Sequence, residues 1–362
     1  MPFTNEVIEG AAARYERERD RYIKLAGRVA DICQASVVEG DAVRAQVTSR
    51  TKTPQSFRGK LDRFSRRPDR NYATVDEVFA VDGISDFAGV RIATYRPEDE
   101  ERVRQRVCEL FCGPDGGPVV VDPKNKLRPE EAQFYRATHC QVFLRDEDLA
   151  GNYDNLRGAS CELQVCSMMA HVWNEIEHDI GYKPDGGGPD PAERGLLEAL
   201  GHLSRSGDAM ITRLLEANQQ RLRSRQGGFS DVHDFVARLR DRFPRADLSV
   251  NAGQAYDAAQ RLGLTSPDAF EGQLGPTSLD EAGARRAIEA FNRFARDSGR
   301  SDATLNAASA DLLTVALLPM LSERWSIERA DGAGRPKSGR LSLLVDVWRD
   351  MADGSAERAA AG

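Results

Sequence analysis

A segment rich in residues that break helices and strands divides this chain. Residues 183–191 have the sequence Lys-Pro-Asp-Gly-Gly-Gly-Pro-Asp-Pro, and such a run continues neither a helix nor a strand. Before it, strand-like and helix-like patterns alternate, whereas after it the patterns are helical only. The sequence therefore predicts an α+β domain at residues 1–183, a linker with a long helix at 184–228, and a helical C-terminal domain at 229–362 that is a candidate for regulation.

Strand and helix patterns alternate within the first domain. The clearest strand is residues 87–95, which are rich in β-branched and aromatic residues. Weaker strand patterns occur at residues 43–49, 118–121, 137–144 and 160–166. Helical spacing predicts helices at residues 5–38, 54–64, 97–111 and 167–180, and residues 124–134 are expected to form a polar loop.

Composition excludes several classes of protein. Of 362 residues, 40% are hydrophobic and 30% are charged, as in soluble globular domains. The longest nearly apolar run, residues 312–321, is half of the ~20 residues that a membrane span needs. The N-terminal residues show no secretory signal, so we expect a cytoplasmic protein without membrane contact. The six cysteines form no CxxC pairs, which favours reduced thiols over a zinc site.

Positive charge is concentrated in one short segment. The formal net charge is −7, yet residues 44–70 contain nine basic and only two acidic residues. A local basic cluster on an acidic protein suits a compact polyphosphate ligand better than a long nucleic-acid duplex. A solvated helix face explains the same pattern, and composition alone does not separate the two interpretations.

Two acidic residues occupy informative positions next to strands. Asp86 directly precedes the strand at 87–95, and Glu162 lies in an apolar strand whose alternation places it on one face with Gln164 and Cys166. A carboxylate in such a strand is explained by a divalent cation shared with a second carboxylate, since Mg²⁺ bound to phosphates usually takes one or two of them. The alternative is an ion pair with one of the many arginines.

A helical segment offers a second candidate metal site. His171, Glu175 and His178 share one helical face at spacings of four and three residues. Trp173 and Ile176 mark the buried side of the same helix, so a packed helix without metal is the alternative.

Five segments in a fixed order resemble the synthetase domain of the RelA/SpoT family, the alarmone (p)ppGpp synthetases. The resemblance covers about residues 40–183 and rests on Arg50-x-Lys52 with Ser56 and Lys60, Asp86-x-x-Gly89-x-Arg91, Tyr135-Arg-Ala-Thr-His139, Glu162-Leu-Gln-Val and residues 171–183. It implies a nucleotidyltransferase-like mixed β-sheet flanked by helices. It also implies a pyrophosphokinase that moves the β,γ-diphosphate of ATP to the ribose 3′-hydroxyl of GDP or GTP and releases AMP.

The resemblance also implies roles for individual residues. The ATP-binding residues would be Arg50, which stacks on adenine, Lys52 and Lys60, which contact the phosphates, and Ser56 and Arg91. The catalytic residues would be Asp86 and Glu162, which hold Mg²⁺, with Glu162 activating the acceptor hydroxyl. The acceptor-binding residues would be Tyr135, which stacks on guanine, and Lys124, His139 and Gln164.

One geometric difficulty accompanies these roles. In an uninterrupted strand Asp86 and Arg91 point to opposite faces, because their separation is an odd number of residues. We therefore expect either that Gly89 kinks the strand or that Arg91 has a structural role.

Departures from the family pattern concentrate on the acceptor side. Phe134 stands where the family has glycine, Ala137 replaces a serine and Cys166 replaces an arginine, while Lys124-Asn125 is separated from Tyr135 by residues 126–134. A lost arginine weakens phosphate binding. Together with the helical tail, these changes favour one alternative, a toxic small synthetase that pyrophosphorylates the 3′-CCA end of tRNA and is neutralised by an antitoxin. An alternative of another class is an inactive nucleotide sensor whose helical tail binds a partner, but the intact Asp86 and Glu162 argue against it. A homo-oligomer is compatible with either.

Overall fold

A computed structural model describes residues 3–67, 70–125, 134–181, 189–223, 225–278, 281–330 and 339–360. Most of the expected polar loop and the glycine-rich part of the breaker segment lie outside these ranges. The chain folds as two units, one formed by residues 1–38 and 43–214 and the other by residues 39–42 and 215–362. The division lies within helix α6 (Pro191–Arg223). No helix among the described residues is long and apolar enough to cross a membrane.

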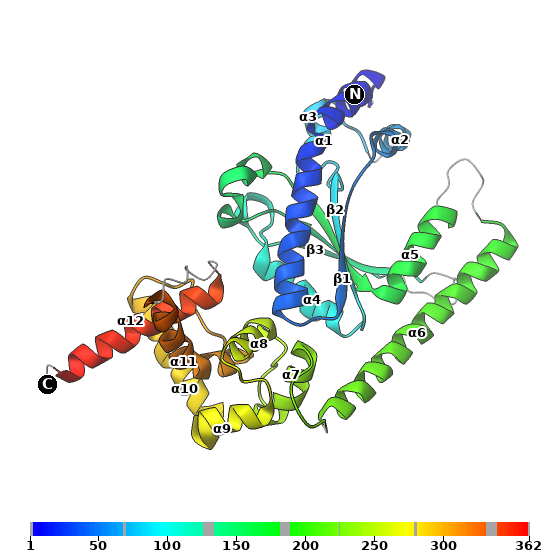
Figure 1. The fold of residues 1–362 in the computed structure, drawn as a ribbon. Helices are drawn as coiled ribbons and strands as arrows, with labels where there is room; N and C mark the ends of the chain where they lie inside the picture. Colours follow the sequence, from blue (N-terminus) through cyan, green and yellow to red (C-terminus); the bar gives the residue numbers. More distant parts are fainter. Residues whose placement is uncertain are drawn as a thin grey trace. The chain divides into compact units, whose positions relative to one another are not determined.

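The first unit is built on a five-stranded mixed sheet (Figure 1). Its strands are β1 (Ala45–Thr51), β2 (Ala88–Thr94), β3 (Val120–Asn125), β4 (Arg136–Val142) and β5 (Cys161–Ser167), in the spatial order β1-β2-β5-β4-β3. β2 and β5 are parallel, and the other neighbours are antiparallel. This sheet, followed by helices in the part of the chain that the structure describes, confirms the predicted fold class.

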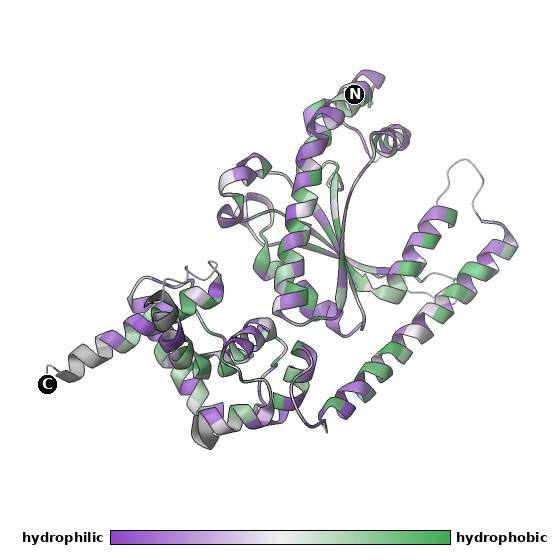
Figure 2. Ribbon diagram, viewed as in Figure 1, coloured by the Kyte–Doolittle hydropathy of each residue, from purple (hydrophilic) through white to green (hydrophobic). Residues whose placement is uncertain are grey.

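One face of the sheet is covered by α1 (Asn5–Cys33) and contributes to the core (Figure 1). Strand alternation directs Val90 and Ile92 of β2 and Leu163 and Val165 of β5 into this core, where each is at most 2% exposed. Each such side chain contributes about 1.5–3 kcal/mol on burial. Helix α1 carries hydrophobic and hydrophilic residues along its length (Figure 2), as expected of a helix with one buried face.

The remaining helices of this unit lie between the strands or follow the last strand. They are α2 (Pro54–Ser65), α3 (Val75–Phe79), α4 (Asp99–Leu110), α5 (Met168–Gly181) and α6, with the short helical segments η1 (Gln34–Gly40), η2 (Pro114–Gly116), η4 (Asp146–Leu149) and η5 (Gly151–Leu156). Thr53 caps α2 by accepting a hydrogen bond from the Ser56 N–H, and Pro54 occupies its first turn.

Two predicted elements have different bounds in the structure. The strand expected at 118–121 is β3, Val120–Asn125, so Lys124 and Asn125 belong to the sheet and not to a polar loop. Pairing with Ala137 and Arg136 of β4 extends the strand despite its polar sequence. The helix expected at 5–38 ends as an α-helix at Cys33 and continues as the π-helical segment η1.

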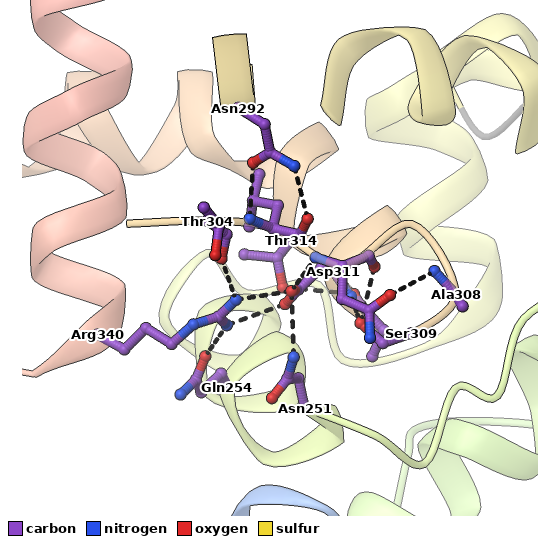
Figure 3. A network of polar contacts seen from close by, with 12 residues as sticks. Asn251, Gln254, Asn292, Thr304, Ala308, Ser309, Asp311, Thr314 and Arg340 are labelled. Atoms are coloured by element: carbon purple, nitrogen blue, oxygen red, sulfur yellow. Dashed lines mark hydrogen bonds and ion pairs between the residues drawn. The ribbon is translucent and has the colours of Figure 1, made fainter. Parts of the chain in front are cut away.

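The second unit is helical and has a hydrophobic core of its own. Its helices are α7 (Val232–Leu239), α8 (Ala252–Arg261), α9 (Pro267–Ser278), α10 (Glu281–Asp297), α11 (Asp311–Ala330) and α12 (Arg340–Ala360), with the turn η6 (Arg240–Arg242). Buried Asp311 links three of these helices (Figure 3): its carboxylate pairs with Arg340 at 2.7 Å and accepts hydrogen bonds from Asn251 and the Asn306 N–H. These donors compensate the desolvation of the Asp311 carboxylate. The buried charge thereby holds together the N-terminal ends of α8, α11 and α12.

Candidate active site

The sheet face opposite α1 carries a continuous set of polar residues. Cross-strand partners share a face, and the register pairs Gly89 with Arg50 and Glu162, and Gln164 with Arg91 and His139. Residues far apart in sequence are thereby placed side by side across β1, β2, β5 and β4. The sequence-predicted alternation of Glu162 and Gln164 places both on this polar face.

Asp86 lies between two lysines. Its carboxylate oxygens are each 2.8 Å from an ammonium group, Oδ2 from Lys52 and Oδ1 from Lys60. Burial raises the pKa of Asp86, but the charges of Lys60 and Lys52 outweigh that effect and hold the pKa below its usual value. The carboxylate is therefore ionised at neutral pH, and two ammonium groups converge on it.

The backbone around Lys52 is held from two sides. Its N–H donates to the Phe87 carbonyl at 3.3 Å, and its carbonyl accepts a hydrogen bond from the Tyr15 hydroxyl at 2.7 Å. Tyr15 is itself packed against Phe57 and Phe87. The helix α1, the helix α2 and the start of β2 thus fix the position of Lys52 beside Asp86.

The predicted conflict between Asp86 and Arg91 does not arise. Strand β2 begins at Ala88, and Asp86 lies in the turn before it. Strand alternation therefore sets the direction of Arg91 but not of Asp86. Of the two expectations, the kink at Gly89 was wrong, because Gly89 is paired in register with both neighbouring strands.

Glu162 begins a chain of hydrogen-bonding groups that ends at Tyr135. Glu162 Oε1 is 3.2 Å from His139 Nδ1, and His139 Nε2 is 2.9 Å from the Tyr135 hydroxyl. Both contacts are satisfied when Nδ1–H donates to Glu162 and Nε2 accepts from Tyr135. Glu162 Oε2 also accepts from Gln164 at 2.8 Å. Burial raises the pKa of Glu162, but His139 and Gln164 more than offset this, so its pKa is lowered although the charge of Asp86 opposes.

Arg91 is enclosed by polar partners from β5 and α5. Its guanidinium donates to Gln164 Oε1 at 2.9 Å, to Glu175 Oε1 at 2.5 Å and to His171 Nδ1 at 2.7 Å. Burial and the charge of Arg91 lower the pKa of His171, which fits a neutral imidazole that accepts this hydrogen bond. Glu175 and His171 are thus the partners of Arg91, and sequence reasoning had missed this role.

The alternative metal site on α5 was wrong for the same reason. His171 and Glu175 converge on a guanidinium, while His178 is exposed and pairs with Asp179 at 3.7 Å. Across the described ranges no group of three or more histidine, cysteine, aspartate or glutamate side chains is placed to hold a metal ion. The six cysteines are free thiols. The motif's i, i+4 spacing correctly indicated a shared helical face, but not what that face binds.

Three other predicted residues lie on or beside β1, α2 and β3. Arg50 is exposed at the end of β1, and its side chain lies over Gly89, whose missing Cβ would be 3.4 Å from Arg50 Cγ. Ser56 lies in the first turn of α2, where its hydroxyl accepts from Thr53 at 2.9 Å. Lys124 is on the edge strand β3 and pairs with Asp122 at 3.0 Å.

The carboxylates of Asp86 and Glu162 fit a magnesium ion bound together with a nucleotide. Mg²⁺ prefers oxygen ligands and keeps one or two protein carboxylates when phosphates supply the rest. Both carboxylates are held ionised, and Glu162 pairs across the sheet with Gly89, which lies three residues after Asp86. Both oxygens of Asp86 are paired with ammonium groups in this structure.

Residues 49–187 match the family model described as the region found in RelA / SpoT proteins. The chain therefore contains a RelA/SpoT region, which confirms the resemblance seen in the sequence. It is also similar to the GTP pyrophosphokinase YjbM of Bacillus subtilis (strain 168), with 26% identity over 130 residues, 36% of this chain. The alignment spans 57% of the length of that relative.

Solved structures with similarity to the chain include two of the small alarmone synthetase 1 from Bacillus subtilis. The first has 20% identity and a TM-score of 0.43, and the match covers 57% of this chain and 98% of that chain. The second, bound to its product pppGpp, has 18% identity and a TM-score of 0.42, with 56% and 97% covered.

Proposed function

We propose that the RelA/SpoT region of this chain is an ATP-dependent pyrophosphokinase. It transfers the β,γ-diphosphate of ATP to the ribose 3′-hydroxyl of GDP or GTP and releases AMP. The observation that carries this proposal is a pair of ionised carboxylates on neighbouring parts of the fold: Asp86, in the turn before β2 and between Lys52 and Lys60, and Glu162 of the adjacent strand β5, beside His139. The segment matched by the family model contains all five residues.

ATP binds at the Asp86 side of the face. Lys52 and Lys60 exchange their contacts with Asp86 for contacts with the phosphates, since a polyphosphate carries more negative charge than one carboxylate. The exposed Arg50 guanidinium provides a flat surface on which adenine stacks. Ser56 lies in the first turn of α2, where helix N–H groups favour anions.

The acceptor binds at the Glu162 side, where Tyr135 offers a ring for stacking on guanine. Glu162 accepts the proton of the 3′-hydroxyl, and His139 holds the carboxylate toward that proton. The 3′-oxygen then forms a bond with the β-phosphorus, while the bond between the β-phosphorus and the oxygen bridging to the α-phosphorus breaks. AMP leaves with that oxygen. Mg²⁺, when bound with ATP, neutralises the charge that develops on the phosphates.

One assay tests this proposal and its alternatives. The full chain is incubated with Mg²⁺ and ATP labelled at the β- or γ-phosphate, together with GDP, GTP or deacylated tRNA. Label transferred to the guanosine nucleotide, with AMP formed in equal amount, is the expected result. Label on the 3′ end of tRNA instead would replace the acceptor and support a toxic small synthetase.

The third outcome contradicts catalysis altogether. If neither acceptor is labelled, and equilibrium dialysis still detects nucleotide binding, the chain is a nucleotide sensor. The helical second unit is then the region in which to look for a binding partner or an antitoxin-like element.

A further inference from the structure

The residues on both sides of Tyr135 are anchored to helix α6. Phe134 is 4% exposed and packs edge-to-face against Trp173 of α5 and His202 of α6, with ring centroids at 5.8 and 4.9 Å. Arg136 contacts Asp208 of α6 at 3.4 Å. Tyr135, the proposed acceptor-stacking residue, is therefore positioned by its two neighbours in the chain.

Gly201 creates the space that Phe134 occupies. A Cβ added at Gly201 would lie 2.2 Å from Phe134 Cδ2 and 2.3 Å from Cγ, far inside van der Waals contact. The buried residues of α6 are Leu197, Gly201, Ser204 and Asp208, which form one stripe at helical spacing. Gly201 lies in the middle of this stripe, so the backbone of α6 approaches the ring of Phe134 directly.

Asp208 fixes the other side of Tyr135. It accepts a hydrogen bond from the Ser167 hydroxyl at 3.0 Å, and Arg136 in addition contacts Glu100 at 2.9 Å. Asn174 of α5 donates to the Arg136 carbonyl at 3.2 Å. These contacts come from α4, α5, β5 and α6, so the start of β4 is held from four elements.

We propose that Phe134, seated against Gly201, is a positioning residue that sets the place of Tyr135 and thereby the binding of the acceptor. This inference rests on the proposed function and names the part of the chain that determines acceptor binding. Phe134 replaces a family glycine, so a bulky anchor stands where a small residue would leave the backbone free. We call the packing of Phe134 against Gly201 the Phe134 seat. The position of Tyr135 in turn affects Glu162, because Tyr135 contacts His139 and His139 contacts Glu162.

The test substitutes Gly201→Ala and compares it with Gly195→Ala. Gly195 lies on the same helix, and a Cβ added there would meet no described atom beyond that helix within 4 Å, so it controls for the gain in helix propensity. Gly201→Ala is expected to raise the KM for GDP or GTP about tenfold or more, because a displacement of an ångström costs up to about a hundredfold. The KM for ATP is expected to change less than about twofold, since the contacts described above for Asp86 and its two lysines come from α1, α2 and β2 and not from α6.

A double-mutant cycle distinguishes an effect that acts through the Phe134 seat from a general loss of folding. In the background Phe134→Ala, the substitution Gly201→Ala is expected to have no further effect on the acceptor KM, because the clashing ring is absent. Equal increases in both KM values, or the same effect of Gly201→Ala in both backgrounds, would overturn the proposal. Thermal unfolding shows that each variant is folded.

A second readout does not depend on catalysis. Amide hydrogen exchange of residues 134–140 is expected to accelerate in Gly201→Ala and to stay unchanged in Gly195→Ala. If the wild-type chain shows no transfer activity but hydrogen exchange responds as expected, the proposed function is wrong, whereas the structural role of the Phe134 seat is supported. Unchanged exchange in Gly201→Ala would refute the seat itself.

Discussion

Replacing Asp86 by Asn separates two effects that this carboxylate has on ATP. Asp86 is ionised and neutralises Lys52 and Lys60, each at 2.8 Å. Without magnesium, its charge repels the phosphates that approach those lysines. For charges about 5 Å apart and an effective dielectric constant between about 20 and 80, that repulsion is about 1–3 kcal/mol. Asp86→Asn is therefore expected to bind magnesium-free ATP about tenfold more tightly.

The same variant should transfer the diphosphate of ATP far more slowly. We expect the rate with magnesium to fall by about three orders of magnitude, because a carboxylate oxygen that would hold the metal beside the phosphates is lost. Binding is measured by isothermal titration calorimetry in EDTA, and transfer with labelled ATP. The matched control is Asp122→Asn, which removes a carboxylate paired with Lys124 at 3.0 Å on the edge strand. Weaker magnesium-free binding by Asp86→Asn, or turnover within about tenfold of wild type, would refute the reasoning.

Three other predictions concern single groups. Glu162→Gln is expected to lower kcat by about two to four orders of magnitude with acceptor KM almost unchanged; a normal kcat in labelled-ATP assays would exclude Glu162 as the base. Tyr15→Phe removes the hydroxyl that donates to the Lys52 carbonyl at 2.7 Å, so it should destabilise the fold by about 1 kcal/mol and raise the KM for ATP. Chemical denaturation measures the first effect, and steady-state kinetics measures the second. Burial raises the pKa of Glu100 to about 7, so the folded state binds a proton that the unfolded state releases, and stability should fall as pH rises from about 4.5 to 7. In thermal unfolding experiments, Glu100→Gln should make stability nearly independent of pH over this range. An unchanged slope would show that another group causes the pH dependence.

The pattern of the sequence was sufficient for the local arrangement of the site. Strand alternation placed Glu162 and Gln164 on one face, because the period of two residues is a property of any strand. The order of the five motifs indicated the RelA/SpoT region that the family model then matched. The change of pattern near residue 183 indicated a domain of strands and helices followed by a helical region.

Only the tertiary structure decided which groups meet across elements. Nothing local to Arg91 shows that His171 and Glu175 from α5 surround it, and the same spacing on α5 suits a metal as well. The close approach of the Gly201 backbone to the Phe134 ring likewise cannot be predicted from either segment alone, since the contact joins residues 67 positions apart. Periodicity depends on the backbone of one element, whereas such contacts depend on how several elements pack, and packing is set by the whole fold at once.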